Sequence, residues 1–235
     1  AAARGARCLA ADLSSEMLRV AAASAPDVLP VQMDAENPSL RTASLDVVLC
    51  LFGILHFPNP QVVLEQCAAA LKPGGTLAFA FGSPPPLSAA IAHAPRVVLD
   101  YARSRRGRLL KAPAALNGFL LERCARVGPS KETALASRAG RSGHLVAMTK
   151  RAGFNKVSTG WLRRRYWVDS PELFWEIQSV FASTSRKLLS EMPPSRQEEL
   201  RCEFIELASE VQQQGGALVY DVATTWIHAK APGYA

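Results

Sequence analysis

The fold of this chain is decided by the stretch Asp46-Val-Val-Leu-Cys-Leu-Phe-Gly-Ile-Leu-His56-Phe-Pro-Asn-Pro60, followed after one helical span by Leu71-Lys-Pro-Gly-Gly-Thr-Leu-Ala-Phe79. The apolar run from Leu45 to Leu51 is too short for a comfortable helix and predicts a strand buried on both faces. Pro60 suits the first turn of the next helix, and the glycines after Pro73 suit a turn. The order strand, helix, turn, strand predicts a βαβ unit of a parallel sheet.

Toward the N-terminus the pattern repeats on a smaller scale. A short apolar run predicts a strand over 7–11, with Asp12 as the first residue beyond it. Ser14 is a credible N-cap for a helix that runs to about residue 25, where Pro26 stops it. A second strand is expected over 28–32. These elements form a second parallel unit.

Beyond Gly82 the alternation of strands and helices that is typical of a parallel sheet ends at Pro84-Pro-Pro86, and a basic, mostly helical insertion follows. Helices are expected over 89–103, 115–126, 143–152, 171–189 and 195–214, with strands over 76–81, 156–162 and 217–228. The alternation of apolar and polar residues in the last strand is typical of an edge strand or a hairpin arm. We expect three parts: a partial cofactor-binding core (1–82), the insertion (83–142), and a C-terminal part with lid helices that completes the sheet (143–235).

Composition describes a globular protein of 235 residues, 49% hydrophobic and 20% charged. The five cysteines show no spacing typical of a zinc site or a disulfide framework, so we expect no metal. No stretch is long and apolar enough to span a membrane, and an intracellular, cytoplasmic location is the default. Between Arg96 and Arg165 there are 17 basic and three acidic residues, a local net charge of +14 in a chain of net +7.

The strand, loop and helix order of residues 7–82 resembles that of class I S-adenosylmethionine-dependent methyltransferases. The segment from Gly143 to Gly160, with its Ala-Gly-Phe154, and Ser170-Pro-Glu-Leu-Phe-Trp175 are similar to the branch that includes the ubiquinone and menaquinone C-methyltransferases. The resemblance implies an α/β fold with a Rossmann-like, doubly wound, mostly parallel sheet and a helical insertion or lid. It also implies S-adenosyl-L-methionine as the cofactor and a small-molecule methyl acceptor.

The resemblance further implies a set of cofactor-binding residues at the ends of three strands. Asp12 would accept hydrogen bonds from both ribose hydroxyls, because a carboxylate offers acceptor sites on two oxygens. The alternative for Asp12 is that it only helps to cap the following helix. Met17 would face either the adenine or the core.

Asp34 matches the place where the family binds the adenine amino group with a carboxylate, and the backbone N–H of Ala35 would bind the ring nitrogen. Without that resemblance, Asp34 is interpreted as an aspartate of the kind that is common in turns. Backbone carbonyls near Cys50 and Leu51 would face the ammonium and sulfonium end of the cofactor, with Phe52 and Phe57 as walls. His56 is the weak candidate for a general base, and an ordinary loop histidine is its alternative.

The strand and Gly-x-Gly-x-Gly loop that the family carries before the position of Arg7 are missing from this sequence. In the family that strand lies between the strands expected here over 7–11 and 45–51. We therefore expect a truncated chain, with evolutionary loss of the strand as the alternative. On either reading this polypeptide alone should bind S-adenosylmethionine weakly or not at all, and be inactive by itself.

Two functions remain open at this point. The first is a small-molecule methyltransferase. The second is a degenerate, non-catalytic methyltransferase fold that binds RNA, a membrane surface or a protein assembly through its basic segment. The RNA contacts would come from the arginine clusters Arg103, Arg105, Arg106, Arg108, Arg163, Arg164 and Arg165, next to Tyr166 and Trp167. A solvated basic face balanced by the acidic residues of 198–210 is the alternative reading of these clusters.

Overall fold

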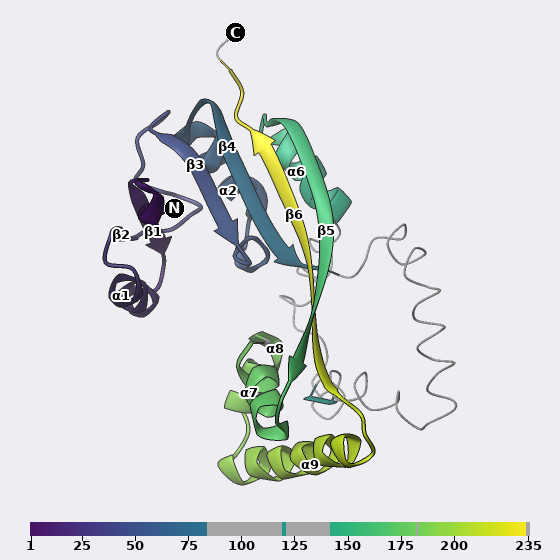
Figure 1. The fold of residues 1–235 in the computed structure, drawn as a ribbon. Helices are drawn as coiled ribbons and strands as arrows, with labels where there is room; N and C mark the ends of the chain where they lie inside the picture. Colours follow the sequence, from purple (N-terminus) through teal and green to yellow (C-terminus); the bar gives the residue numbers. More distant parts are fainter. Residues whose placement is uncertain (84–118, 121–141, 182, 234–235) are drawn as a thin grey trace. The chain divides into compact units, whose positions relative to one another are not determined.

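The computed structural model describes residues 1–83, 119–120, 142–181 and 183–233 (Figure 1). Its strands are β1 (Cys8–Asp12), β2 (Val28–Gln32), β3 (Leu45–Leu51), β4 (Leu71–Gly82), β5 (Asn155–Val168) and β6 (Leu218–Lys230). Its α-helices are α1 (Ser15–Ser24), α2 (Pro60–Ala70), α6 (Ser142–Arg151), α7 (Pro171–Phe181), α8 (Ser183–Ser190) and α9 (Pro194–Gln213), and the short 3-10 helices are η1 (Ala2–Arg4) and η2 (Ile54–His56). The helices expected over 89–103 and 115–126 lie outside the described residues, apart from Phe119 and Leu120.

Strands β1 and β2 form a two-stranded parallel sheet in register from Cys8 opposite Val28 to Asp12 opposite Gln32. Helix α1 connects them, and it begins where Ser14 was expected to cap it: the Ser14 side chain accepts a hydrogen bond from the Met17 N–H at 3.3 Å. The helix ends at Ser24, just before Pro26. The strand–helix–strand unit expected near the N-terminus is confirmed.

The other four strands form a mixed sheet in the order β3-β4-β6-β5. Strands β3 and β4 are parallel, whereas β4 and β6 are antiparallel. Strand β6 is therefore an interior strand, so of the two expected alternatives, an edge strand or a hairpin arm, the edge strand is wrong. An interior strand covered on only one face has the same apolar and polar alternation as an edge strand, so the pattern could not separate the two.

One face of this sheet carries the first hydrophobic core. Leu77, Phe79 and Phe81 of β4 and Ile227 of β6 are at most 1% exposed and pack with residues of α2 and α6. Figure 1 shows both helices on the same side of the four strands. Helix α6 contributes the fully buried Leu145. The β3–α2–β4 unit predicted from the sequence is confirmed.

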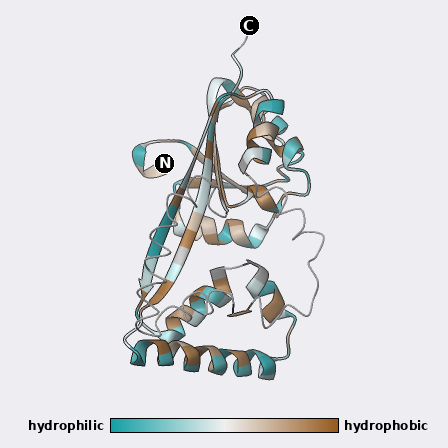
Figure 2. Ribbon diagram, turned by 90° about the vertical axis from the view of Figure 1, so that its right-hand side faces the viewer, coloured by the Kyte–Doolittle hydropathy of each residue, from teal (hydrophilic) through white to brown (hydrophobic). Residues whose placement is uncertain are grey.

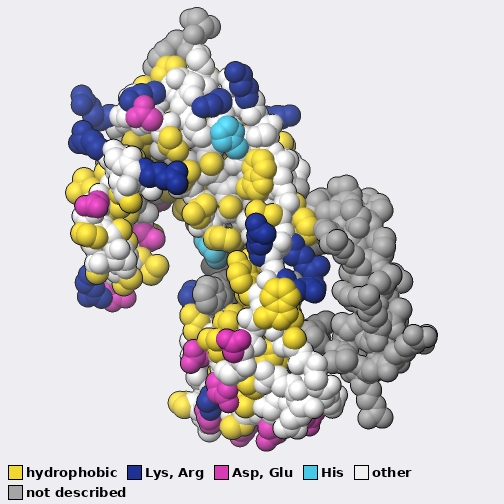
Figure 3. Space-filling model, in the orientation of Figure 1, with side chains coloured by type: hydrophobic (Ala, Val, Ile, Leu, Met, Phe, Trp, Pro, Cys, Tyr) yellow, Lys and Arg dark blue, Asp and Glu magenta, His cyan; other side chains and the backbone are white. Residues whose placement is uncertain are grey.

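The opposite face of β3 is open. Val47, Leu49 and Leu51 alternate along the strand and are 51%, 59% and 70% exposed. Figure 3 shows hydrophobic side chains at the surface on this side of the sheet. The expectation that β3 is buried on both faces is wrong. A continuous apolar run shows that a strand could be buried on both faces, but it does not show whether another layer of the protein covers each face.

Strand β4 starts earlier than expected, with an irregularity near its beginning. Leu45 pairs with Leu71, but Val47 pairs with Thr76, so Lys72 to Gly75 bulges out of the ladder. Gly74 has φ +72°, and a Cβ on Gly75 would lie 2.8 Å from the Lys72 carbonyl oxygen, so both glycines are required by this bulge. The Lys72 ammonium lies 2.7 Å from the Asp46 carboxylate across the same bulge.

Described by itself, the part of the chain from 161 to 223 contains α7, α8 and α9 and has its own core. Phe174 and Phe204 are fully buried there and their ring centroids are 5.5 Å apart. Figure 2 shows hydrophobic and hydrophilic bands alternating along α9, as one buried face requires. We expected one helix over 171–189, whereas the structure has α7 and α8; no proline or glycine between 172 and 190 signals this break.

Described by itself, the other compact unit consists of residues 1–83, 142–160 and 224–233 among the described ones, and it contains both sheets' parallel strand pairs. Strands β5 and β6 run on from one unit into the other, and β5 extends to Val168, six residues beyond the expected end of that strand. No helix in the described parts of the chain is both long and apolar enough to cross a membrane. The fold is an α/β, Rossmann-like arrangement.

Candidate functional site

The carboxylate of Asp12 lies at the carboxyl end of β1, where α/β sheets bind ligands. Its Oδ1 accepts a hydrogen bond from the Ser14 N–H at 2.8 Å, and Ser14 in turn caps α1. Asp12 thus supports the start of the helix indirectly, through one oxygen. The side chain is exposed, which leaves the carboxylate accessible to a ligand donor.

Asp34 lies at the same end of the neighbouring strand. The Met33 N–H donates to the Asp12 carbonyl at 3.1 Å, which extends the pairing of β1 and β2 to the residue before Asp34. The Gln32 amide donates to the Leu13 carbonyl at 3.0 Å and links the same two loops. Asp34 is exposed, and its Oδ1 accepts from the Glu36 N–H at 2.9 Å in a turn of its own. The structure therefore brings Asp12 and Asp34 to one edge of one sheet.

A residue that the sequence analysis missed fixes the loop after β2. The Glu36 carboxylate accepts two hydrogen bonds from Asn59, one from its backbone N–H at 2.8 Å and one from its side-chain amide at 2.9 Å. Asn59 immediately precedes α2, so this contact ties the loop that carries Asp34 and Ala35 to the start of the helix after β3. No local pattern signals a pair 23 residues apart.

The turn after β3 holds Cys50 and Leu51 at the carboxyl end of that strand. The Cys50 thiol is partly buried, which raises its pKa, while hydrogen bonds from the backbone of Gly53 and Ile54 lower it by a smaller amount. Leu51 is 70% exposed. Phe52 has φ +62°, and its N–H donates to the Ala80 carbonyl at 2.8 Å. The turn is thus anchored to β4 on one side and to Cys50 on the other.

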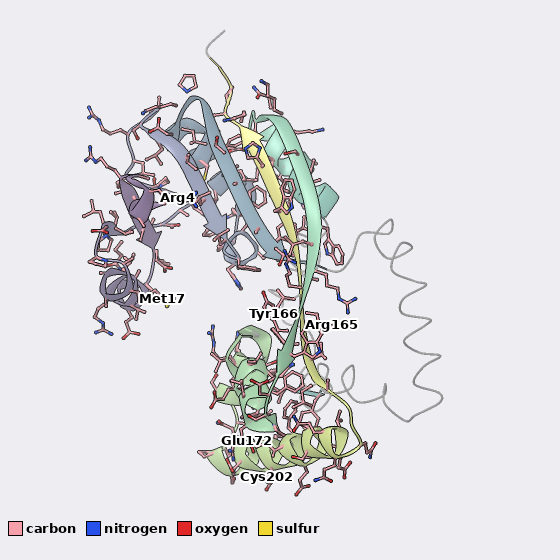
Figure 4. The ribbon with its side chains drawn as sticks, in the orientation of Figure 1. Arg4, Met17, Arg165, Tyr166, Glu172 and Cys202 are labelled. Carbon is pink, nitrogen blue, oxygen red and sulfur yellow. The ribbon has the colours of Figure 1, made fainter. Side chains whose placement is uncertain are left out.

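His56 is the last residue of η2 and is exposed. Its N–H donates to the Gly53 carbonyl at 2.9 Å, which closes the short 3-10 turn. Met17 is 60% exposed on α1, and Figure 4 labels its side chain beside that helix. The core position in α1 belongs to Leu18, which is 7% exposed, so packing does not explain Met17.

The two parallel pairs are separate in the sheet pairing, because β1 pairs with β2 and β3 pairs with β4, and no strand in the described residues links β1 to β3. The carboxylates of Asp12 and Asp34 and the turn after Leu51 consequently lie on different sheets. Nor do any three His, Cys, Asp or Glu side chains within the described ranges gather as a metal site would require.

The arginines singled out in the sequence fall into two groups. Arg103, Arg105, Arg106 and Arg108 lie outside the described residues. Arg163, Arg164 and Arg165 lie on β5 and are exposed, next to Tyr166 at 54% and Trp167 at 70% exposure. Figure 4 shows Arg165 and Tyr166 side by side on this strand.

Comparison with known proteins adds family information to this geometry. Residues 1–79 match the family model described as a methyltransferase domain. The chain is 38% identical over 82 residues to a ubiquinone biosynthesis O-methyltransferase of Idiomarina loihiensis, an alignment that covers 32% of this chain and 33% of that protein. A protein of the same description from Xanthomonas campestris is 35% identical over 79 residues, 31% of this chain and 33% of its own.

The alignments therefore span about a third of the length of these curated relatives. Among solved structures, a candidate methyltransferase from Bacillus halodurans C-125 superposes with a TM-score of 0.52 at 18% sequence identity, over 97% of this chain and 84% of its own. This likeness shows the fold. The chain is therefore similar to methyltransferase domains over residues 1–79, and it shares the fold of a solved candidate methyltransferase.

Proposed function

We propose that the protein is an S-adenosylmethionine-dependent methyltransferase that acts on a small molecule. One observation supports this above the others: two exposed carboxylates, Asp12 and Asp34, stand together at the carboxyl edge of adjacent parallel strands inside the segment that matches the methyltransferase domain. Neither carboxylate forms an ion pair with another of the described residues. Both are available to hydrogen-bond donors of a nucleoside.

In this proposal Asp12 accepts the ribose hydroxyls, and Asp34 accepts the adenine amino group while the Ala35 N–H serves the ring nitrogen. Oδ1 of each carboxylate accepts a backbone hydrogen bond in its own turn, so that the side chain is already oriented and Oδ2 is left as the acceptor for the cofactor. Charged hydrogen bonds of this kind contribute on the order of 1.5–3 kcal/mol each. Met17, exposed on α1, would cover one side of the adenine.

Cys50 and Leu51 are proposed to present backbone carbonyls to the positively charged end of the cofactor. Carbonyl oxygens suit a cationic group because they carry partial negative charge. The chain supplies this turn in a rigid form, since Phe52 is bonded to Ala80 and Gly53 lies against the Cys50 sulfur. Such fixed dipoles need little reorganisation when a charge approaches.

S-adenosylmethionine supplies an electrophilic methyl group on a sulfonium. Held by Asp12, Asp34 and the turn after Leu51, it would supply this methyl group to a nucleophilic atom of the acceptor, and the electron pair of the carbon–sulfur bond would stay on the sulfur. The main task of the protein is to hold the acceptor in line and exclude water. An acceptor hydroxyl also has to lose a proton, and the exposed His56 is the candidate to take it.

The acceptor class follows from the relatives, which are described as O-methyltransferases. We therefore propose an oxygen nucleophile on a small organic molecule. We also propose an intracellular setting, since Cys8, Cys50, Cys67 and Cys202 are free thiols, as a reducing compartment would keep them.

The proposal is tested by titrating the 235-residue chain with S-adenosylmethionine and following the amide resonances of Asp12, Asp34 and Ala35 by NMR. Because the two halves of the site lie on separate sheets, weak, millimolar binding is expected. Asp12→Asn and Asp34→Asn should each weaken it by roughly 10-fold or more. Asp27→Asn, an exposed carboxylate just before β2, is the matched control and should leave the titration unchanged. Chemical-shift changes that include none of Asp12, Asp34 and Ala35 would refute the proposed site.

RNA binding through β5 is the second candidate, and the observation in its favour is that Arg164, Tyr166 and Trp167 are all exposed on one strand. Arginine side chains bind phosphate groups, and aromatic rings stack on unpaired bases. Binding of a generic single-stranded RNA that weakens steeply with added salt, and that Trp167→Ala reduces, would support it. Retention of binding in that variant would count against the β5 surface.

A further inference from the structure

Strand β3 has one paired edge and one open edge. Among the described residues its only neighbour in the four-stranded sheet is β4, and the Phe52 N–H that follows the strand donates to the Ala80 carbonyl of β4. Because the N–H and C=O groups of successive residues point to opposite sides of a strand, the even-numbered residues of this stretch bond to β4. The backbone groups of Val47, Leu49 and Leu51 therefore point to the open edge.

The same three residues also expose their side chains. Val47, Leu49 and Leu51 are 51%, 59% and 70% exposed. No charged residue, proline or glycine stands between 47 and 52. An apolar strand with unpaired backbone groups and no such protection at its edge readily pairs with another strand.

The other strand edges among the described residues are protected or short. Strand β5, at the opposite edge of the four-stranded sheet, carries Lys156 and the exposed Arg163, Arg164 and Arg165, and like charges would face each other if two such edges met. In the two-stranded sheet Pro30 removes an N–H from β2, and β1 has only five residues. Strand β3 therefore offers the longest unprotected apolar edge.

We propose that β3 is a self-association surface, at which two copies of this chain pair their β3 strands antiparallel about Leu49. In this register Leu49 lies opposite Leu49 of the second copy, and Val47 lies opposite its Leu51. Residues that face each other in this way exchange both of their N–H···O=C bonds, so every backbone group of the two open edges is paired. The exposed side chains fall on one face of the joined sheet, where each gains an apolar neighbour across the strands.

The charge at the start of β3 selects the antiparallel direction. The Asp46 carboxylate lies 2.7 Å from the Lys72 ammonium of its own chain. Antiparallel pairing about Leu49 places each Asp46 opposite Phe52 of the other copy, with the two carboxylates about 20 Å apart at ~3.4 Å per residue. Parallel pairing in register would place the carboxylates side by side, which is destabilising.

The antiparallel arrangement also limits the size of the assembly. A two-fold axis through Leu49 uses the open edge of both copies, so no β3 edge is left for a third. A closed dimer is expected, and not a fibre.

The pairing uses the Leu51 carbonyl, which the proposed function assigns to the cofactor. Self-association does not depend on that function, and each proposal can fail alone. Association is measured without S-adenosylmethionine, whereas the cofactor titration follows Asp12 and Asp34 on the two-stranded sheet.

Amide hydrogen exchange, followed residue by residue by NMR from about 10 μM to about 1 mM, tests the pairing on the unmodified chain. Raising the concentration should protect the amides of Val47, Leu49 and Leu51 at least about 10-fold more. The amides of Val48 and Cys50, which bond to β4, should keep the same protection throughout. Sedimentation over the same range should show the mass rising from 25.3 kDa to twice that value.

Three results of this experiment would overturn the proposal. One is a chain that stays monomeric at every concentration. Another is protection of the Leu49 amide that does not change with concentration, because a segment of the same chain would then cover the edge. The third is growth beyond the dimer, because the pairing would then not be closed.

A charge placed on the two-fold axis provides the mutational test. Leu49→Lys brings two ammonium groups face to face and should raise the dissociation constant of the dimer at least about 10-fold. Leu29→Lys is the matched control, because Leu29 of β2 is 61% exposed and Leu49 is 59% exposed. Both variants should keep the circular dichroism of the unmodified chain. Equal effects of the two substitutions on the dimer would contradict the role of β3.

A pair of charges tests the register. Val47→Lys alone and Leu51→Glu alone should each weaken the dimer, because each puts a charge opposite an apolar side chain. Combined in one chain, they place each new ammonium opposite a new carboxylate of the second copy. The double variant should recover the dissociation constant to within about 3-fold of the unmodified chain. A double variant that associates no better than the single ones would rule out the antiparallel register.

Discussion

The two parallel strand pairs of this protein begin from similar sequence patterns and reach different degrees of burial. The β3–β4 pair contributes Leu77, Phe79 and Phe81 to a core that α2 and α6 cover. The β1–β2 pair has α1 alone, and in α1 only Leu18 is buried. Leu9 of β1 and Leu29 of β2 are 44% and 61% exposed.

The difference separates the proposed site into a firmly supported half and a lightly supported half. Cys50 and Leu51 extend from a strand that is packed on one face, whereas Asp12 and Asp34 stand on a pair with little buried apolar surface. Burial of apolar area is the main source of stability, so local opening is expected to occur first in β1, α1 and β2. The contact between Glu36 and Asn59 partly offsets this by tying the loop after β2 to α2.

The largest effect is expected when the two pairs are compared by truncation. Phe79→Ala should destabilise the protein by about 3–5 kcal/mol, because the ring is 1% exposed and leaves a cavity. Leu29→Ala should cost about 0.5 kcal/mol or less, since that side chain is already in contact with water. Urea denaturation measures both; equal losses would mean that β1 and β2 are as well packed as β4.

A second substitution tests whether close packing reaches the far side of the four-stranded sheet. A Cβ on Gly160 of β5 would lie 2.4 Å from the Trp226 ring of β6, so Gly160→Ala should cost about 1–3 kcal/mol and alter tryptophan fluorescence. Gly143→Ala is the matched control, because nothing lies within 4 Å of its Cβ position in α6. An alanine tolerated equally at both positions would show that Trp226 moves freely.

The last comparison concerns a pH-dependent effect, that of the Cys67 thiol of α2, whose pKa burial raises from an ordinary 9.0 to about 12, with a further contribution from Cys50. The unfolded thiol ionises first, so the folded state binds more protons and stability falls as pH rises from about 9 toward 12. The loss is about 1.4 kcal/mol per pH unit within that window. The stability difference between the native chain and Cys67→Ala should shrink over this range; a constant difference from pH 8 to 11 would contradict it.

Local signals predicted most of the elements. The Ser14 cap placed α1, Pro60 placed α2, and the apolar run at 45–51 placed β3 to the residue. Interactions over long sequence separations could not be predicted in this way. The open face of β3, the interior position of β6 and the Glu36–Asn59 contact depend on partners that no short window contains.

The same division holds for the candidate site. The family resemblance implied that Asp12 and Asp34 stand at the ends of their strands, and the backbone bond between Met33 and Asp12 places these two strand ends next to each other. The separation of these residues from Cys50 and Leu51 follows from sheet pairing. Their roles toward a cofactor remain a proposal, and so do those of Met17, Ala35 and His56.

The most direct test of the account asks whether Asp12 and Asp34 bind one nucleoside together. A double-mutant cycle of Asp12→Asn and Asp34→Asn, with the affinity for S-adenosylmethionine read from NMR titrations, measures this. The account predicts that each change weakens binding about 10-fold or more, that both act on the same set of perturbed amides, and that the double variant shows no binding. Binding that survives in the double variant, or perturbed amides confined to residues far from β1 and β2, would contradict it.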